Sequence, residues 1–221
     1  MKQQIFILRM LQLTKNQLIE LDRIQRMHLI NSCTGVKSAN LIGTINDKGQ
    51  TNLAIFNSIS HLGSNPPMIT FLLRPKTVER HTYENIISQK SFTINQVSIE
   101  HIQQAHQTSA KYPSDISEFE ACGFTADFQE GIIAPFVKES KIQMACEYVN
   151  EYHIKEHDCH LIVGEIQLIR FEKGIQHEDG WLDAAKANSA GCIGLDGYVS
   201  LNLEDRYAYA RPENEIKSLL K

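Results

Sequence analysis

Short apolar runs separated by polar turns dominate the chain from residue 41 to residue 171. The run LIGTI at 41–45 is followed by the turn residues DKGQ and then by a second run, NLAIFNSIS, at 52–60. Two apolar runs joined by a tight turn predict a β-hairpin. The runs MITFLLR at 68–74 and SFTINQV at 91–97 predict two further strands.

The second half of the chain carries the pattern of a long hairpin. The stretches 141–153 and 161–171 have strand-like patterning, and the segment between them is polar. With the four earlier runs this gives six strands, which are short, joined mostly by hairpins and interrupted by few helices. This order favours a mainly β fold, an antiparallel barrel with peripheral helices, over a parallel sheet.

Three segments have helical patterning instead. Thr14 and Gln17 form a capping-box pair that opens an N-terminal helix over about 15–28, with one apolar face that we expect to pack on another element. A short helix is expected over 77–87. The stretch 98–131 is helical and irregular, and we interpret it as an excursion from the barrel. The pattern predicts one domain over 1–221.

Composition removes several classes of function. The chain has 221 residues, 42% hydrophobic and 22% charged, with a formal net charge of −4 and no dense basic run. That balance is typical of a globular domain and disfavours nucleic acid or an anionic membrane surface as the main partner. No apolar stretch approaches the roughly 20 residues that span a bilayer, so we expect a cytoplasmic protein.

The sequence also argues against a metal centre. The five cysteines are far apart and form no CxxC pair. His153, His157 and His160 are close in sequence, but their spacing suits one helix face, whereas their surroundings have the pattern of strand and turn. We therefore expect a solvated polar hairpin there and no metal.

Small polar residues gather where the second strand ends. Asn57, Ser58 and Ser60 follow an apolar run, and Ser58 and Ser60 share a face if the strand continues through both. Hydroxyls and backbone amides in such a rim match the carbonyl and imino groups of a planar heterocycle. The alternative is an ordinary turn rich in Ser and Asn.

A second polar group follows one strand later, in RPKTVERHTYENI. Arg80, His81 and Thr82 are expected in the first half of the helix that begins near Thr77. A cation and a hydroxyl beside the free amides of a helix N-terminus form a seat for phosphate. The alternative is a routine surface helix.

Several of these stretches resemble the flavin reductase-like proteins with the FMN-binding split-barrel fold. The matching segments are KSANLIGT, NLAIFNSISHLGSNPP, FLLRP, HTYENI, QTSAKYP, SEFEACGF, DGWLDAAKANSAGCIGLDGY and YARP, which span nearly the whole chain in order. The resemblance implies a six-stranded antiparallel Greek-key split barrel and a homodimer with FMN near the subunit interface. It implies these cofactor-binding residues: Ser38, Asn40, Asn57, Ser58, Ser60, Arg80, His81 and Thr82.

The implied activity is hydride or electron transfer through bound FMN, with NADH or NADPH as reductant and a small-molecule or protein electron acceptor. Flavin chemistry needs no acid–base pair at the reacting carbon, so no catalytic residue is named. His106, Lys111 and Tyr112 are candidates for the substrate side. The family's Gly-Asp-His element is replaced here by HDCH, with Cys159 or His160 at the histidine position. That departure leaves open an electron-transfer carrier without NAD(P)H turnover. A third hypothesis is a barrel that has lost flavin and binds another small ligand or partner.

Overall fold

The computed structural model describes residues 10–75 and 80–220. The helices are α1 (Lys15–Glu20), α2 (Arg23–Ser32), α3 (His81–Gln89), the 3-10 turn η1 (Ile99–His101), α4 (Ile102–Gln107) and α5 (Glu118–Ala121). The strands are β1 (Val36–Ser38), β2 (Asn40–Ile45), β3 (Thr51–Phe56), β4 (Ser60–Ser64), β5 (Pro67–Leu73), β6 (Ser91–Gln96), β7 (Ala126–Asp127), β8 (Phe136–Val137), β9 (Ile142–Ile154), β10 (Cys159–Phe171), β11 (Ala190–Ile193) and β12 (Gly197–Ser200).

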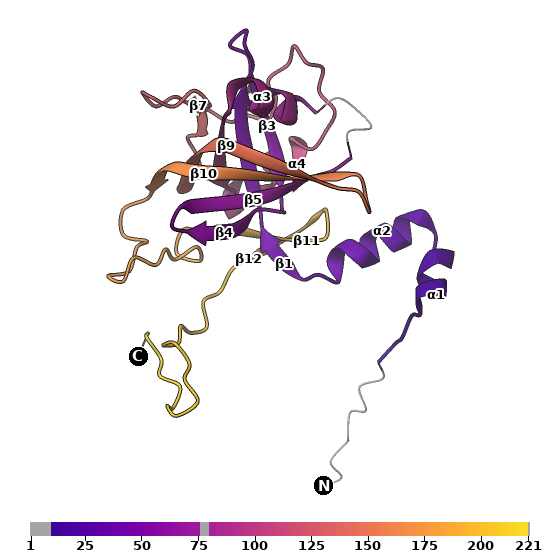
Figure 1. Cartoon of the computed structure of the whole chain (residues 1–221), viewed down its shortest axis with the longest axis vertical. Helices are drawn as coiled ribbons and strands as arrows, with labels where there is room; N and C mark the ends of the chain where they lie inside the picture. The colour runs from indigo at the N-terminus through magenta and orange to yellow at the C-terminus, as the bar shows by residue number, and fades with distance from the viewer. Residues whose placement is uncertain (1–9, 76–79, 221) are drawn as a thin grey trace.

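The principal sheet is antiparallel and has the strand order β3-β2-β6-β9-β10-β5-β4. Its two edge strands, β3 and β4, are consecutive in the chain and joined by residues 57–59 alone. Four peptide units span at most about 14 Å. The sheet must therefore curl until its edges approach each other, and Figure 1 shows the resulting barrel-like body.

The predicted mainly β split barrel is confirmed, with one difference in the strand count. The sheet has seven strands instead of six because the run at 52–60 is not one strand. β3 ends at Phe56, and Ser60 begins β4 by pairing with Thr70 on the opposite edge of the sheet. The expectation that Ser58 and Ser60 lie on one face of one strand is therefore wrong.

The core lies on both sides of β2, whose residues alternate between two clusters. Ile42 joins the barrel interior, where Phe71 forms edge-to-face contacts with Phe56 and Phe92 at ring-centroid distances of 5.3 and 5.6 Å. Leu41 joins the cluster beneath α4 and α5. Burial on both faces explains why this strand is apolar without interruption up to its Gly-Thr pair.

A smaller sheet, β1-β11-β12, adjoins the barrel. The backbone of Ala39, immediately after β1, donates to Ala190 and accepts from Val97, which joins the two sheets. Residues 98–131, expected to be a helical and irregular excursion, hold η1, α4 and α5, separated by loops, and then the short strand β7. No helix within the described parts of the chain is long and apolar enough to cross a membrane.

Two predicted helices have different bounds. The N-terminal helix expected over 15–28 is two helices, because the chain is extended at Leu21 and Asp22 begins a new cap. Neither helix buries a residue against the rest of the chain, and both project from the body (Figure 1). The helix expected from Thr77 begins at His81, with Arg80 as its N-cap residue, and 76–79 lie outside the described residues.

Gly164 in β10 lies against the barrel's aromatic centre, which gives a stability prediction. A Cβ added there would lie 2.6 Å from Cζ of Phe92 and 3.3 Å from the Glu147 carbonyl oxygen. We expect Gly164→Ala to lower the free energy of unfolding by about 2 kcal/mol through overpacking. Chemical denaturation of Gly164→Ala, Phe92→Leu and the double variant measures the effect.

Phe92→Leu removes the atoms that the new methyl group would strike. The double variant should therefore lose less stability than the two single losses combined. Strictly additive losses would show that the ring is not what constrains Gly164.

Candidate functional site

The link between β3 and β4, residues 57–59, forms the rim predicted from the sequence. The Ser58 hydroxyl accepts from the Leu72 backbone N–H and donates to the Leu72 carbonyl, both at 3.1 Å. The Ser58 side chain thus forms the two hydrogen bonds to β5 that the backbone of a neighbouring strand would otherwise form. The expectation was that this hydroxyl would face a ligand. Instead, both of its hydrogen bonds are made to the Leu72 backbone.

Asn57 and Asn40 fix the other side of the rim. The Asn57 side-chain amide donates to the Gly194 carbonyl at 2.8 Å, which ties the rim to the turn between β11 and β12. Asn40 pairs with Phe56 at the end of β3 and is only 2% exposed. Its amide donates to the Ser38 carbonyl and hydroxyl at 3.1 and 2.8 Å. These predicted residues therefore come together, as supports of the rim.

The groups of the rim that are free to bind a ligand are backbone N–H groups. The N–H groups of Asn57, Ser58 and Ile59 donate to no acceptor anywhere in 10–75 or 80–220. Ser60 is exposed, and its hydroxyl makes only a long contact of 3.4 Å to the His61 carbonyl. Consecutive free backbone donors on a partly buried edge suit a flat ligand that carries acceptor atoms.

Arg80 carries an unsatisfied cation at the start of α3. Its Nη2 donates to the Pro75 carbonyl at 3.3 Å, just beyond the end of β5. Its Nε is buried and finds no acceptor within the described structure. α3 also has no side-chain cap at this end. A buried guanidinium N–H without an acceptor costs stability, and an anion at the helix N-terminus would satisfy it.

The other two predicted phosphate residues have different surroundings. Thr82 is 6% exposed, and its hydroxyl accepts from the Asn52 amide at 3.0 Å. Asn52 and Asn85 both donate to the Thr44 hydroxyl, so these four side chains form a buried network that holds α3 on the barrel. The Thr82 hydroxyl thus supports the position of α3, and a role of Thr82 toward a phosphate stays a prediction.

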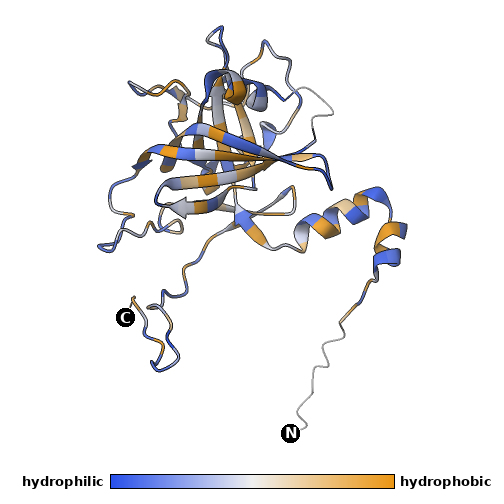
Figure 2. Ribbon diagram, in the orientation of Figure 1, coloured by the Kyte–Doolittle hydropathy of each residue, from blue (hydrophilic) through white to orange (hydrophobic). Residues whose placement is uncertain are grey.

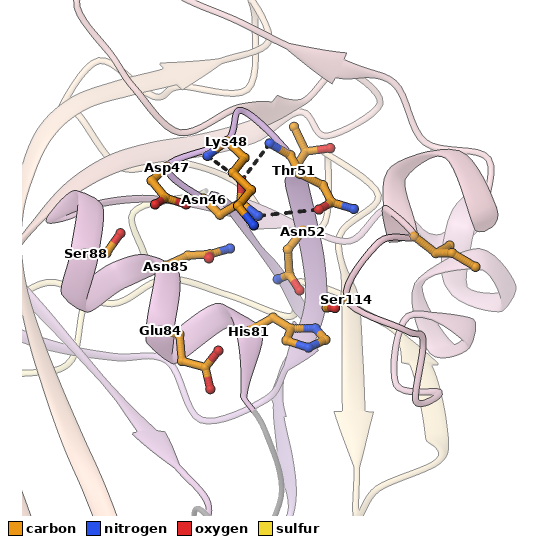
Figure 3. Close-up of a pocket in the computed structure, with 12 residues that line it drawn as sticks. Asn46, Asp47, Lys48, Thr51, Asn52, His81, Glu84, Asn85, Ser88 and Ser114 are labelled. Atoms are coloured by element: carbon orange, nitrogen blue, oxygen red, sulfur yellow. Dashed lines mark hydrogen bonds between the residues drawn. The ribbon is translucent and has the colours of Figure 1, made fainter.

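His81 lines a separate polar cleft of about 350 Å³ between the turn at 46–50, α3 and the loop near Ser114 (Figure 3). None of the other predicted site residues lines it. The side-chain oxygen of Asn46 already accepts hydrogen bonds from the backbone N–H groups of Lys48 and Gln50. With charges of both signs and no aromatic wall other than the imidazole, this cleft is a poorer seat for a planar cofactor than the rim.

Of the substrate-side candidates, His106 is connected to the rim by a chain of contacts through Tyr198 and Cys192. Its Nδ1 is 3.0 Å from the Tyr198 hydroxyl on β12. Tyr198 pairs with Cys192, whose sulfur accepts from the Asn57 amide at 3.7 Å. Burial, chiefly, raises the pKa of Tyr198 to about 12. Tyr198 was not predicted as a site residue, because its contact with His106 joins two segments that are distant in the sequence.

Of the other two candidates, Tyr112 forms its hydrogen bonds inside the excursion. The Tyr112 hydroxyl accepts from Gln107 at 3.0 Å and from Cys122 at 3.7 Å. Lys111 is exposed, and the structure gives it no hydrogen bond or ion pair. Neither forms a hydrogen bond to the rim within the described chain.

The tip of the β9–β10 hairpin holds a polar network that the sequence did not reveal. The His160 side chain is only 13% exposed, with Nδ1 3.3 Å from Glu151 Oε1. The Tyr83 hydroxyl of α3 donates to the same oxygen at 3.0 Å, and His153 stacks on His160 at 5.0 Å. The predicted solvated hairpin is therefore wrong for His160. The register of the hairpin brings His153, Glu151 and His160 together, and the packing of α3 adds Tyr83.

Metal ligation has no support in this network. No group of three or more His, Cys, Asp or Glu side chains in 10–75 and 80–220 could hold a metal ion. His157 approaches Cys159 at the turn, at 3.9 Å from Nδ1 to the sulfur.

These features define a class of protein: a split β-barrel with a rim of free backbone donors and, at the start of α3, a guanidinium whose Nε lacks an acceptor in the described structure. Residues 36–186 match the sequence profile described as the flavin reductase like domain. The chain belongs to the flavin reductase-like family.

Three other proteins are similar to this chain to different degrees. A split-barrel protein from Shewanella frigidimarina NCIMB 400, provisionally described as a flavin reductase, is 39% identical with a TM-score of 0.88, over 90% of this chain and 100% of that one. Nitrilotriacetate monooxygenase component B from Bacillus cereus is 22% identical with a TM-score of 0.77, over 90% and 98% of the two chains, which shows the fold alone. An uncharacterised protein from Aquifex aeolicus (strain VF5) is 29% identical over 160 residues, covering 72% of this chain and 81% of that protein.

The environment of Tyr198 predicts a late ionisation. Because folding raises the pKa of this phenol, the folded chain holds its proton more tightly than the unfolded chain does. The resulting stabilisation is complete below pH 10 and is lost as the pH rises through about 12. The difference between phenolate absorbance titrations of the wild type and Tyr198→Phe isolates this group. We expect a midpoint near 12, and a midpoint near the ordinary value of about 10 would contradict the described burial.

Proposed function

We propose that the chain is an FMN-binding oxidoreductase that transfers hydride or electrons through flavin held on the rim at 57–59. The observation that carries the proposal is the buried, unpartnered Nε of Arg80 at the N-terminus of α3. An uncapped helix start with an unsatisfied guanidinium fits a phosphate monoester, which FMN carries and riboflavin lacks.

The rim complements this seat. Contacts join it to Arg80 through the end of β5, because Ser58 bonds Leu72 and Arg80 bonds the Pro75 carbonyl. The free N–H groups of 57–59 would bind the acceptor edge of the ring system. Family membership and the Shewanella relative support a flavin ligand over other planar ligands.

The protein's own contribution is binding and orientation. When bound, flavin supplies the hydride and electron chemistry, which no side chain supplies. Asn57 and Ser58 hold the rim through contacts to Gly194 and Leu72, and Arg80 neutralises the phosphate. We propose NADH or NADPH as the reductant, a small molecule or a protein as the electron acceptor, and a homodimer as the working form.

A specific observation favours the alternative of an electron-transfer carrier without NAD(P)H turnover. Cys159 is 6% exposed, and the His160 side chain is 13% exposed and stacked on His153. The residues at the position of the family's Gly-Asp-His histidine are thus largely buried, which limits their access to a nicotinamide.

Anaerobic titration of the FMN-loaded protein separates the two functions. We expect NADH or NADPH to bleach the visible flavin absorbance rapidly and stoichiometrically. Bleaching by dithionite alone would establish the carrier instead. A protein that gains no flavin absorbance when mixed with FMN or FAD would contradict both functions.

Arg80→Met tests the phosphate seat. Loss of a charge-assisted hydrogen bond should weaken FMN binding roughly 10- to 100-fold. Riboflavin has no phosphate, so its dissociation constant should hardly change, and it serves as the matched control. Fluorescence titration measures both constants. Equal weakening for the two ligands would show that Arg80 supports the fold and not the phosphate.

A further inference from the structure

The polar cleft beside the turn at 46–50 is a preformed hollow that the proposed flavin site does not use. The turn is closed by the Asn46 side-chain oxygen, which accepts from two backbone N–H groups of the turn at 3.0 and 2.9 Å. The loop at 114–117 forms another wall, and a 2.6 Å hydrogen bond between the hydroxyls of Thr51 and Ser117 ties it to β3. The volume of about 350 Å³ lies at the lower end of the range for small-molecule sites.

Two asparagines from facing elements form the buried part of the cleft lining. Asn52 of β3 and Asn85 of α3 are each 8% exposed, and both line the cleft (Figure 3). Their side-chain N–H groups donate to the Thr44 hydroxyl at 3.2 and 3.1 Å, and Asn52 also donates to the Thr82 hydroxyl at 3.0 Å. The oxygen of each amide points away from these partners. Neither oxygen accepts a hydrogen bond from any residue that the structure describes.

The protons of this network require an acceptor oxygen in the cleft. The Thr44 hydroxyl carries a single proton, so it can donate to at most one of the two amides beside it. At least one amide must therefore donate through its nitrogen and turn its oxygen away from Thr44, and in the structure both amides do so. A nearly buried carbonyl oxygen has lost most of its hydration, which favours a ligand that brings a hydrogen-bond donor.

The walls of the cleft add negative charge. Asp47 on the turn and Glu84 on α3 both line it, and neither forms an ion pair with a cation of residues 10–75 or 80–220. Lys48 is the only lysine or arginine among the described lining residues. Figure 2 shows the turn in hydrophilic colours. An ammonium group has one positive charge and three N–H donors, so it matches both the carboxylates and the amide oxygens.

Other ligands match the cleft less well. A phosphate would place its own oxygens against two carboxylates and two amide oxygens. An uncharged alcohol could donate to the amide oxygens but would leave the carboxylates without a cation. A metal ion has no support either, because no group of three or more His, Cys, Asp or Glu side chains among the described residues could hold one.

We propose that this cleft is a second ligand site, which binds a small aliphatic primary amine. The ammonium group donates to the side-chain oxygens of Asn52 and Asn85, and the carboxylates of Glu84 and Asp47 neutralise its charge. None of the rim residues 57–59 lines the cleft. The amine and a flavin therefore bind to separate surfaces, and the inference does not depend on the proposed flavin site.

Isothermal titration calorimetry of the full-length protein with n-butylamine tests the site. n-Butanol has the same carbon chain without the charge, so it is the matched ligand control. At low salt we expect one saturable site with a dissociation constant of about 1 mM or lower for n-butylamine, and binding at least about 10-fold weaker for n-butanol. The constant for n-butylamine should be the same with and without FMN.

Substitutions in the wall and in the floor locate the bound amine. Asp47 and Glu84 are exposed, so the double variant Asp47→Asn, Glu84→Gln should fold normally and should weaken n-butylamine binding roughly 10-fold. Asn85→Asp keeps the shape and adds a negative charge, so it should strengthen binding severalfold. Glu178→Gln removes an exposed carboxylate outside the cleft and should change nothing. Circular dichroism of each variant reports folding independently of binding.

Four results would each overturn the proposal. They are no saturable binding of n-butylamine up to about 10 mM, equal binding of n-butanol, a constant unchanged in the double variant, and displacement of n-butylamine by FMN. Flavin binding is measured separately by visible absorbance. A cleft that binds no amine therefore leaves the flavin proposal standing, and a chain that binds no flavin leaves the test of the cleft unchanged.

Discussion

The rest of the structure depends on the three-residue link between the two edges of the principal sheet. Residues 57–59 join β3 to β4, which lie at opposite ends of the strand order. Because the link is short, it draws the two edges of the sheet together. The backbone of the link itself lies between the two edges and is left unpaired. The Ser58 hydroxyl supplies the hydrogen bonds that β5 would otherwise lack, at Leu72. The backbone amides of the link are then free to bind a ligand.

A buried polar network places the second half of the site. Thr44, Asn52, Thr82 and Asn85 fix the first turns of α3 against β2 and β3. The amide–hydroxyl bonds offset the cost of burying these side chains. They set the position of Arg80, one residue before the helix, relative to the end of β5. The helix is thus held by neutral hydrogen bonds, while the Arg80 Nε, which has no acceptor among the described residues, remains available to an anion.

Much of this fold could be predicted from the sequence, because strand texture and tight turns are local signals. The hairpin at 41–60 and the long pair β9–β10 appear directly in the pattern of apolar residues. The break after Phe56 could not be predicted, since it depends on which edge Ser60 pairs with, a contact made only after closure. The hydrogen bonds of the Ser58 and Thr82 hydroxyls to Leu72 and Asn52 also join residues that are distant in the sequence. The sequence alone therefore could not show that these hydroxyls have partners within the fold.

The central claim is that flavin lies on the link at 57–59 with its phosphate at Arg80. A crystal structure of the protein soaked with FMN tests it most directly. The account predicts density for the ring system against the backbone of 57–59 and density for the phosphate within hydrogen-bonding distance of the Arg80 guanidinium. Density for FMN in the cleft beside the turn at 46–50, with the rim and Arg80 unaltered, would contradict it.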